Sequence, residues 1–86
     1  MSEYDDSELE VFAADGLRVP VIHMTTAGGP PSADIKVGGQ GYQYDRSYPI
    51  KGHSATLPKY LIEQVAAGKQ PLLIERPDRF YVYIAK

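Results

Sequence analysis

The last part of the chain, TLPKYLIEQVAAGKQPLLIERPDRFYVYIAK (residues 56–86), carries the signals that most constrain the fold. Ser54 or Thr56 can cap the N-terminus of a helix, because their side-chain oxygens accept a bond from a free backbone N–H. Pro58 is tolerated in the first turn, where its missing N–H would have no intrahelical partner. The sequence therefore predicts a helix over about residues 57–67.

One face of this helix is expected to be buried. Apolar side chains recur on it at four-residue spacing, at Leu57, Leu61 and Val65. Tyr60 and Ile62 flank this row, while Lys59 and Glu63 fall on the opposite side. This pattern is typical of a helix that packs on a single layer.

A well-specified stop and a β-hairpin follow the helix. Gly68 stands where a left-handed C-terminal cap is favoured, and Pro71 comes too soon for the helix to continue. Pro77 and Asp78 then form a turn signal between two apolar runs. The last run predicts a strand with an aliphatic face and a tyrosine face, made of Phe80, Val82 and Ile84 against Tyr81 and Tyr83.

A second hairpin is predicted near the N-terminus. Asp15-Gly16 suits a type I′ turn between strands at about residues 8–14 and 17–24. Pro20 cannot donate a ladder hydrogen bond, so the second strand should be an edge or carry a bulge there. A two-residue loop sets four side chains on one core-facing side, Phe12 opposite Val19 and Ala14 opposite Leu17.

The segment 25–40 reads as a long Gly/Pro-rich loop, in which Ile35 and Val37 are the apolar anchors. Loops of this length are functional, disordered or ordered by a partner. Alternation in YQYDRSYPIK predicts one more strand, interrupted or ended near Pro49.

The order of these elements predicts an α+β fold, β-β-loop-β-α-β-β. We expect a small, mainly antiparallel sheet with one helix packed on one face. The 86 residues form one predicted domain with a flexible acidic tail at 1–7. A chain of this size has a small core, so its monomer should be marginally stable.

Composition excludes several classes of protein. Without cysteine there is no disulfide framework, thiolate nucleophile or sulfur-based zinc site. No run approaches the roughly 20 apolar residues of a membrane span. The N-terminus, MSEYDDSELE, lacks the features of a secretory signal, so we expect a cytoplasmic protein that does not bind membranes.

No residue supports a catalytic, cofactor or metal site. His23 and His53 stand far apart without acids at ligand spacing. The adjacent His53 and Ser54 resemble a base and a nucleophile only in being neighbours, since such pairs are defined by spatial geometry. The glycine clusters also lack phosphate-loop spacing. We therefore expect a non-enzymatic protein that needs no cofactor.

Tyrosines and arginines suggest an interface instead. One shared sheet is expected to hold the candidate residues, which are Tyr42, Tyr44, Arg46, Tyr48, Arg76, Arg79, Tyr81 and Tyr83. Such a platform suits stacked bases or a protein partner, and a half-buried sheet face without a partner stays an open alternative. Residues 1–43 carry a charge of −5 and residues 44–86 a charge of +3, for a net charge of −2. A net negative chain favours the protein interface over nucleic acid.

The segment SATLPKYLIEQVAAGKQPLLIERPDRFYVYIA, which covers the last third of the chain, resembles the helix and hairpin of the Phd/YefM antitoxins. The matching residues are Leu57, Leu61, Val65, Ala67, Gly68, Leu73, Ile74 and Arg76. More faintly, KGHSATLP is similar to the helix entry of AbrB-like swapped-hairpin regulators, through Gly52, Leu57 and Pro58. Both resemblances imply a dimeric DNA-binding regulator. Where AbrB-like domains carry arginines around the helix, this helix offers Lys59 alone.

The leading hypothesis is a small protein-interaction module that acts as an accessory, assembly or regulatory subunit. Its partner would be another protein, a further copy of itself, or both. The alternative is a DNA-binding transcriptional regulator or antitoxin, which the family resemblance implies.

Overall fold

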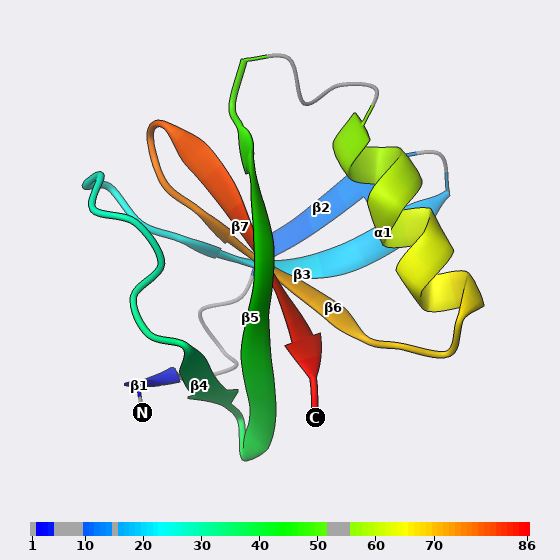
Figure 1. Cartoon of the computed structure of the whole chain (residues 1–86), viewed down its shortest axis with the longest axis horizontal. Coiled ribbons are helices and arrows are strands. Elements are labelled where there is room, and N and C mark those ends of the chain that lie inside the picture. Colours follow the sequence, from blue (N-terminus) through cyan, green and yellow to red (C-terminus); the bar gives the residue numbers. More distant parts are fainter. Residues whose placement is uncertain (1, 5–9, 15, 52–55) are drawn as a thin grey trace.

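The protein is one mixed sheet with a single helix on one face in the computed structural model, which describes residues 2–4, 10–14, 16–51 and 56–86 (Figure 1). In chain order the elements are β1 (Ser2–Tyr4), β2 (Glu10–Ala14), β3 (Leu17–His23), β4 (Asp34–Val37), β5 (Gln40–Pro49), α1 (Thr56–Ala66), β6 (Pro71–Glu75) and β7 (Arg79–Ala85).

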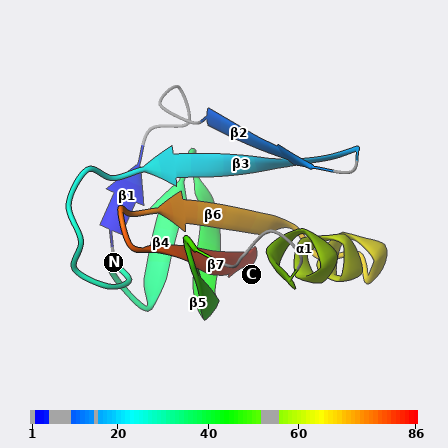
Figure 2. The same ribbon diagram turned by 90° about the horizontal axis from the view of Figure 1, so that it is seen from above.

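The sheet has seven strands within the described part of the chain, in the order β1-β4-β5-β7-β6-β3-β2. The β1–β4 and β3–β6 pairs are parallel and the other four are antiparallel. Figure 1 shows β5 crossing steeply over β3 and β6, and Figure 2 shows β2, β3 and β6 lying in succession. The predicted α+β class is therefore confirmed, while the predicted strand order needs two additions.

The first addition is β4, which lies inside the segment 25–40 that was predicted as a loop. Ile35 and Val37 are both buried and point to one face of the sheet. Gly38 and Gly39 join β4 to β5 with positive φ angles of 55° and 88°, as a two-residue type I′ turn requires. The glycines that marked a loop are thus a hairpin turn.

The second addition is β1, which pairs in parallel with β4 through Ser2 opposite Ile35. Residues 2–4 are therefore part of the sheet and not of a flexible acidic tail. The remainder of the predicted tail, residues 1 and 5–7, lies outside the described residues. The partner of β1 is distant in the sequence, so the acidic residues around β1 carry no local signal that predicts this strand.

The N-terminal hairpin has the predicted register. Phe12 lies opposite Val19 and Ala14 lies opposite Leu17. Pro20 pairs with Val11 of β2, and it comes before the first residue of β3 that pairs with β6, which is Val21. The missing N–H therefore leaves no gap in that ladder, and β3 is an interior strand. Asp15 and the predicted strand positions 8 and 9 lie outside the described residues.

The helix ends as predicted. Gly68 has a φ of 82°, its N–H donates to the Val65 carbonyl at 3.0 Å, and the Lys69 N–H donates to the Gln64 carbonyl at 3.0 Å. These two bonds form a Schellman motif, which satisfies carbonyls that the helix leaves free. At the start, Thr56 is the first helical residue and Pro58 lies in the first turn. The alternative cap, Ser54, lies outside the described residues.

Replacing Gly68 by alanine tests this cap. We expect Gly68→Ala to lower the free energy of unfolding by about 1 kcal/mol, because a Cβ is strained at positive φ. No atom lies within 4 Å of the added carbon, so the backbone alone accounts for the cost. The matched control is Gly41→Ala, where φ is not positive and the added carbon makes an ordinary 3.7 Å contact with Lys86. Equal urea midpoints for both variants would contradict the strained cap.

Both faces of β6 and β7 are buried, in two separate cores. The core under α1 consists of Val19, Val21, Leu57, Leu61, Leu73, Phe80 and Val82. The core on the far face consists of Ile22, Ile35, Val37, Leu72, Ile74, Tyr81 and Tyr83. The predicted alternation of β7 is thus correct, because its aliphatic and tyrosine residues enter different cores.

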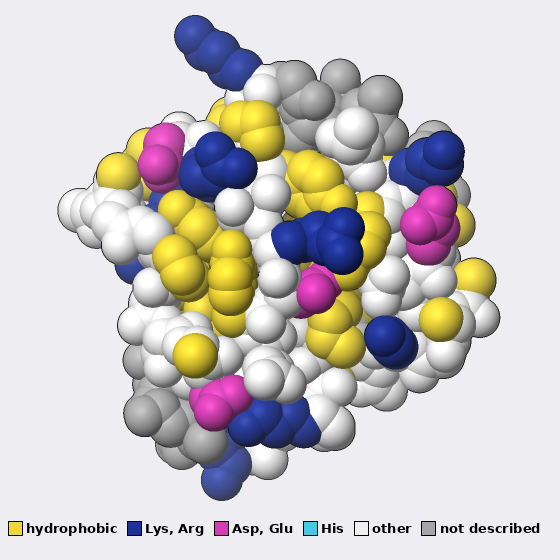
Figure 3. Space-filling view, in the orientation of Figure 1, with side chains coloured by type: hydrophobic (Ala, Val, Ile, Leu, Met, Phe, Trp, Pro, Cys, Tyr) yellow, Lys and Arg dark blue, Asp and Glu magenta, His cyan; other side chains and the backbone are white. Residues whose placement is uncertain are grey.

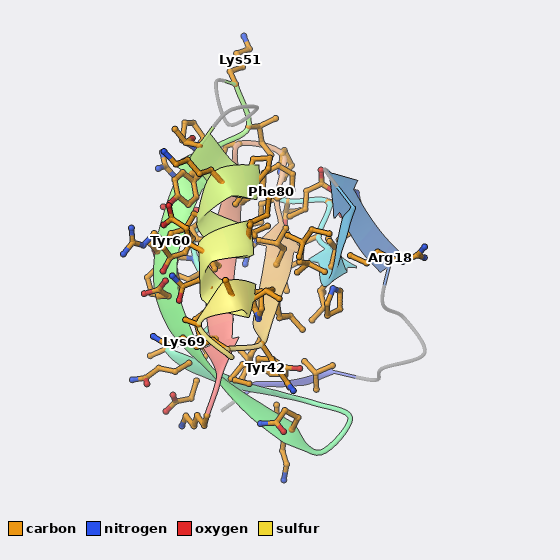
Figure 4. All side chains as sticks on the ribbon, turned by 90° about the vertical axis from the view of Figure 1, so that its right-hand side faces the viewer. Arg18, Tyr42, Lys51, Tyr60, Lys69 and Phe80 are labelled. Carbon is orange, nitrogen blue, oxygen red and sulfur yellow. The ribbon has the colours of Figure 1, made fainter. Side chains whose placement is uncertain are left out.

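The helix lies to one side of its face of the sheet. Figure 4 shows α1 in front of β6 and β7, with β3 and β2 beside it. The inward residues of β3, Val19 and Val21, are buried in the core under α1. Leu57 and Leu61 are fully buried, but Val65 is 44% exposed and its neighbour Ile62 is 40% exposed. The prediction that Val65 is buried is therefore wrong. Its position on the helix faces sideways over β3, where no second element of the described chain covers it.

Alanine substitutions distinguish the two positions that the periodicity treats alike. We expect Leu61→Ala to cost about 2–4 kcal/mol of unfolding free energy, because it opens a cavity in the core. We expect Val65→Ala to cost about 0.5 kcal/mol or less, since its side chain already meets solvent. Chemical denaturation of both variants measures the difference. Similar losses of unfolding free energy at both positions would contradict the difference in burial between Leu61 and Val65.

Candidate interaction surfaces

An extra residue in β5 divides the predicted tyrosine platform. Tyr44 lies opposite Tyr83 and Arg46 lies opposite Val82, so Asp45 is a β-bulge. Alternation along a strand reverses at such a bulge. Tyr42 and Tyr44 therefore pack on the far-face core, while Arg46 and Tyr48 lie opposite residues of the core under α1.

The far-face tyrosines belong to the core. Tyr81 is 4% exposed and Tyr83 is fully buried, so neither can form a surface, and their assignment to an interface is corrected. Tyr44 packs on both, with ring centroids 6.2 Å and 5.5 Å away. The Tyr83 hydroxyl donates to the Ser32 carbonyl at 2.5 Å, which fixes the segment before β4. Tyr44 and Tyr42 are half-buried at the rim of this core.

The helix-facing half of β5 forms a polar cluster with Tyr60, a residue that sequence reasoning did not place in a site. The Tyr60 hydroxyl donates to the Asp45 carboxylate. The Arg46 guanidinium lies 4.1 Å from the centroid of the Tyr60 ring, and the Tyr48 ring lies 5.9 Å from it. The helix is thus held against the bulge by a hydrogen bond, a cation–π contact and a ring contact.

The electrostatics of this cluster keep its groups in their ordinary charge states. Burial raises the pKa of Tyr60 from 10.0 to about 12, with a further contribution from its bond to Asp45. A hydrogen bond with Tyr48 raises the pKa of Arg46. At neutral pH the phenol is a donor and the guanidinium a cation. Arg46 is the most exposed member of the predicted interface, with 53% of its side chain accessible.

We expect Tyr60→Phe to lower the free energy of unfolding by about 0.5–1 kcal/mol at neutral pH. This range is modest because solvent screens an exposed pair. The folded pKa exceeds the ordinary value, so the stabilisation is complete below pH 10 and disappears as pH rises through 12. Urea unfolding from pH 7 upward measures both proteins. The difference between wild type and variant should shrink above pH 10, and parallel profiles would contradict the Asp45 bond.

The two arginines of the β6–β7 turn are engaged within the chain. Arg76 Nη1 donates to the Thr26 carbonyl at 2.7 Å, which ties the 24–33 segment to the turn. Arg79 Nε donates to Ser47 Oγ at 3.0 Å. Both arginines thus help to hold loops in place, and their predicted role at an interface stays a prediction.

An apolar groove runs beside the helix, along its flank toward β3. One hollow, of about 290 Å³, is lined by Gly16, Leu17, Ile62, Val65 and Ala66. An adjoining hollow, of about 280 Å³, shares Val65 and is lined also by Arg18, Val19, Pro20, Tyr42, Lys69, Gln70 and Pro71. We call this the α1–β3 groove. In the sequence, Ile62 beside the apolar row of the helix was the one indication of this groove, whereas the four-residue periodicity assigned Val65 to the core.

The described residues contain no group of three or more side chains that could hold a metal ion. His23 Nδ1 lies 2.9 Å from Glu75 Oε1, across the parallel β3–β6 pair. His53 and Ser54 lie outside the described residues. Within the described chain, α1 is too short and too polar to cross a membrane.

Comparison with known proteins gives no match from which a function could be transferred. The chain matches no family model, no curated protein and no solved structure.

Proposed function

We propose that this protein is a small, non-enzymatic interaction module that acts as an accessory, assembly or regulatory subunit. The α1–β3 groove is its docking surface for an apolar segment of a partner protein. The exposure of Ile62 and Val65 beside Leu17 carries the proposal, because these apolar side chains line one groove and not scattered surface sites.

The energetics support this use of the groove. Fully burying a Val or Ile side chain stabilises by about 1.5–3 kcal/mol, so covering two half-exposed ones contributes about 2 kcal/mol. This is about 1 kcal/mol for each residue, which is below the level of an interface hot spot and adds to the other contacts of a docked segment.

The distribution of charge favours a protein partner over DNA. On the face drawn in Figure 3, Lys and Arg side chains stand apart from one another, with hydrophobic side chains between them. Arg76 and Arg79 donate hydrogen bonds within the chain. Duplex binding relies on clustered cations that neutralise neighbouring phosphates. A DNA-binding regulator or antitoxin, as the Phd/YefM resemblance implies, is therefore the less supported alternative.

A glutamine pair in the groove tests the function. We expect Ile62→Gln/Val65→Gln to lose partners that the wild-type protein retains from a lysate of its native host, because it removes the apolar contact without adding charge. Glutamine has good helix propensity, so circular dichroism should show the fold intact. Quantitative mass spectrometry of proteins bound to each immobilised variant measures the loss.

The matched control is Lys59→Gln/Glu63→Gln, which places the same residues on the solvent side of α1. It should retain the wild-type partners. If the groove variant retains them equally well, docking at this groove is refuted. If the specifically retained species is nucleic acid, the DNA-binding alternative replaces the proposal.

A further inference from the structure

The two edges of the sheet differ in how well they are protected against pairing. β1 closes one side with three residues, and one of these is Glu3. β2 closes the other with five, of which Val11 to Ala14 carry neither charge nor proline. Natural proteins shield edge strands with shortness, charge, proline or bulges. By these criteria β1 is shielded and β2 is a template for another strand.

We propose that β2 pairs antiparallel with β2 of a second copy of this chain, in the register centred on Phe12. The inference rests on the proposed function, since it adds a second copy to an interaction module, but it uses a different surface from the α1–β3 groove. Dimerisation and partner docking can therefore fail separately.

The hydrogen-bond pattern of the hairpin makes β2 complementary to itself. A two-residue loop joins Ala14 to Leu17, and the pair next to such a loop exchanges both backbone bonds. By alternation Glu10, Phe12 and Ala14 bond toward β3, while Val11 and Ala13 direct their N–H and C=O groups outward. In the Phe12-centred register each Val11 meets Ala13 of the second copy, and every outward group finds a partner.

Charge and overlap select this register among the alternatives. It pairs all five residues of β2, whereas any other shift leaves part of the strand unpaired. Glu10 comes opposite Ala14 of the second copy, so no like charges face each other. The two Phe12 positions come opposite each other in a non-hydrogen-bonded pair, the closer of the two pair types and one that favours aromatic residues.

The dimer would extend the proposed docking surface. An antiparallel pair of edges has its two-fold axis perpendicular to the sheet, so both helices lie on the same side of the joined sheet. The two β2–β3 hairpins then meet at the axis, between the two helices. Each dimer would present two α1–β3 grooves on the same side of the joined sheet, which suits a two-fold symmetric or extended partner.

Charged edge variants test the pairing and its register together. We expect Val11→Lys and Ala13→Glu each to raise the dimer dissociation constant about tenfold, because each places an unpaired charge in the joined ladder. The double variant Val11→Lys/Ala13→Glu should return to within about threefold of wild type, since every Lys then faces a Glu across the axis. Sedimentation equilibrium from micromolar to millimolar protein measures all four proteins.

Two further measurements keep the test specific. Gln43→Lys adds the same charge as Val11→Lys at an exposed position of β5 and should leave the dissociation constant unchanged. Hydrogen exchange should slow at the Val11 and Ala13 amides as protein concentration rises, and stay constant at Phe12, which already bonds to β3.

Three results would overturn the proposal. Wild-type protein that stays monomeric at millimolar concentration rules out the dimer. Single variants that dimerise like wild type place the contact elsewhere, and a double variant as weak as the singles excludes the Phe12-centred register. If the edge variants are monomeric but keep wild-type lysate partners, the groove function stands without its symmetric form. If Ile62→Gln/Val65→Gln keeps its partners while the edge variants lose the dimer, the dimer stands and the groove function fails.

Discussion

The extra residue at Asp45 is the constraint on which the rest of the structure depends. A strand as long as β5 would otherwise present Tyr42, Tyr44, Arg46 and Tyr48 on one face. The bulge reverses the alternation midway, so that the first half packs on the far-face core and the second half meets the helix. One strand thereby takes part in two cores.

The same residue holds the helix in place. Asp45 accepts the hydrogen bond of Tyr60, and Arg46 packs on the ring of that tyrosine from the next position along β5. These contacts draw α1 toward the β5 side, over β6 and β7. On the side of the helix toward β3, Val65 and Ile62 stay partly exposed beside Leu17.

Both proposals arise from this asymmetry. A helix centred over the sheet would bury its whole apolar row and leave little for a partner to bind. Here the row runs out over a groove that Leu17 of β3 also lines, and the neighbouring edge strand β2 has no charge or proline between Val11 and Ala14. A small domain buries a smaller fraction of its surface than a large one, so a partner at the groove or at the edge would add to its buried area.

Local backbone chemistry let the sequence by itself determine the helix with its Gly68 cap, the turns at Gly16 and Pro77, the Phe12–Val19 register and the two faces of β7. Each of these depends on neighbours within a few residues. Only the tertiary structure decided the bulge at Asp45, the pairing of β1 with β4, the burial of Tyr81 and Tyr83, and the exposure of Val65. The physical reason is that burial depends on what lies across the sheet, and a one-residue change in register sends every later side chain to the other face. Of the candidate interface residues, Tyr81 and Tyr83 are buried in the core, and the role of the others stays a prediction.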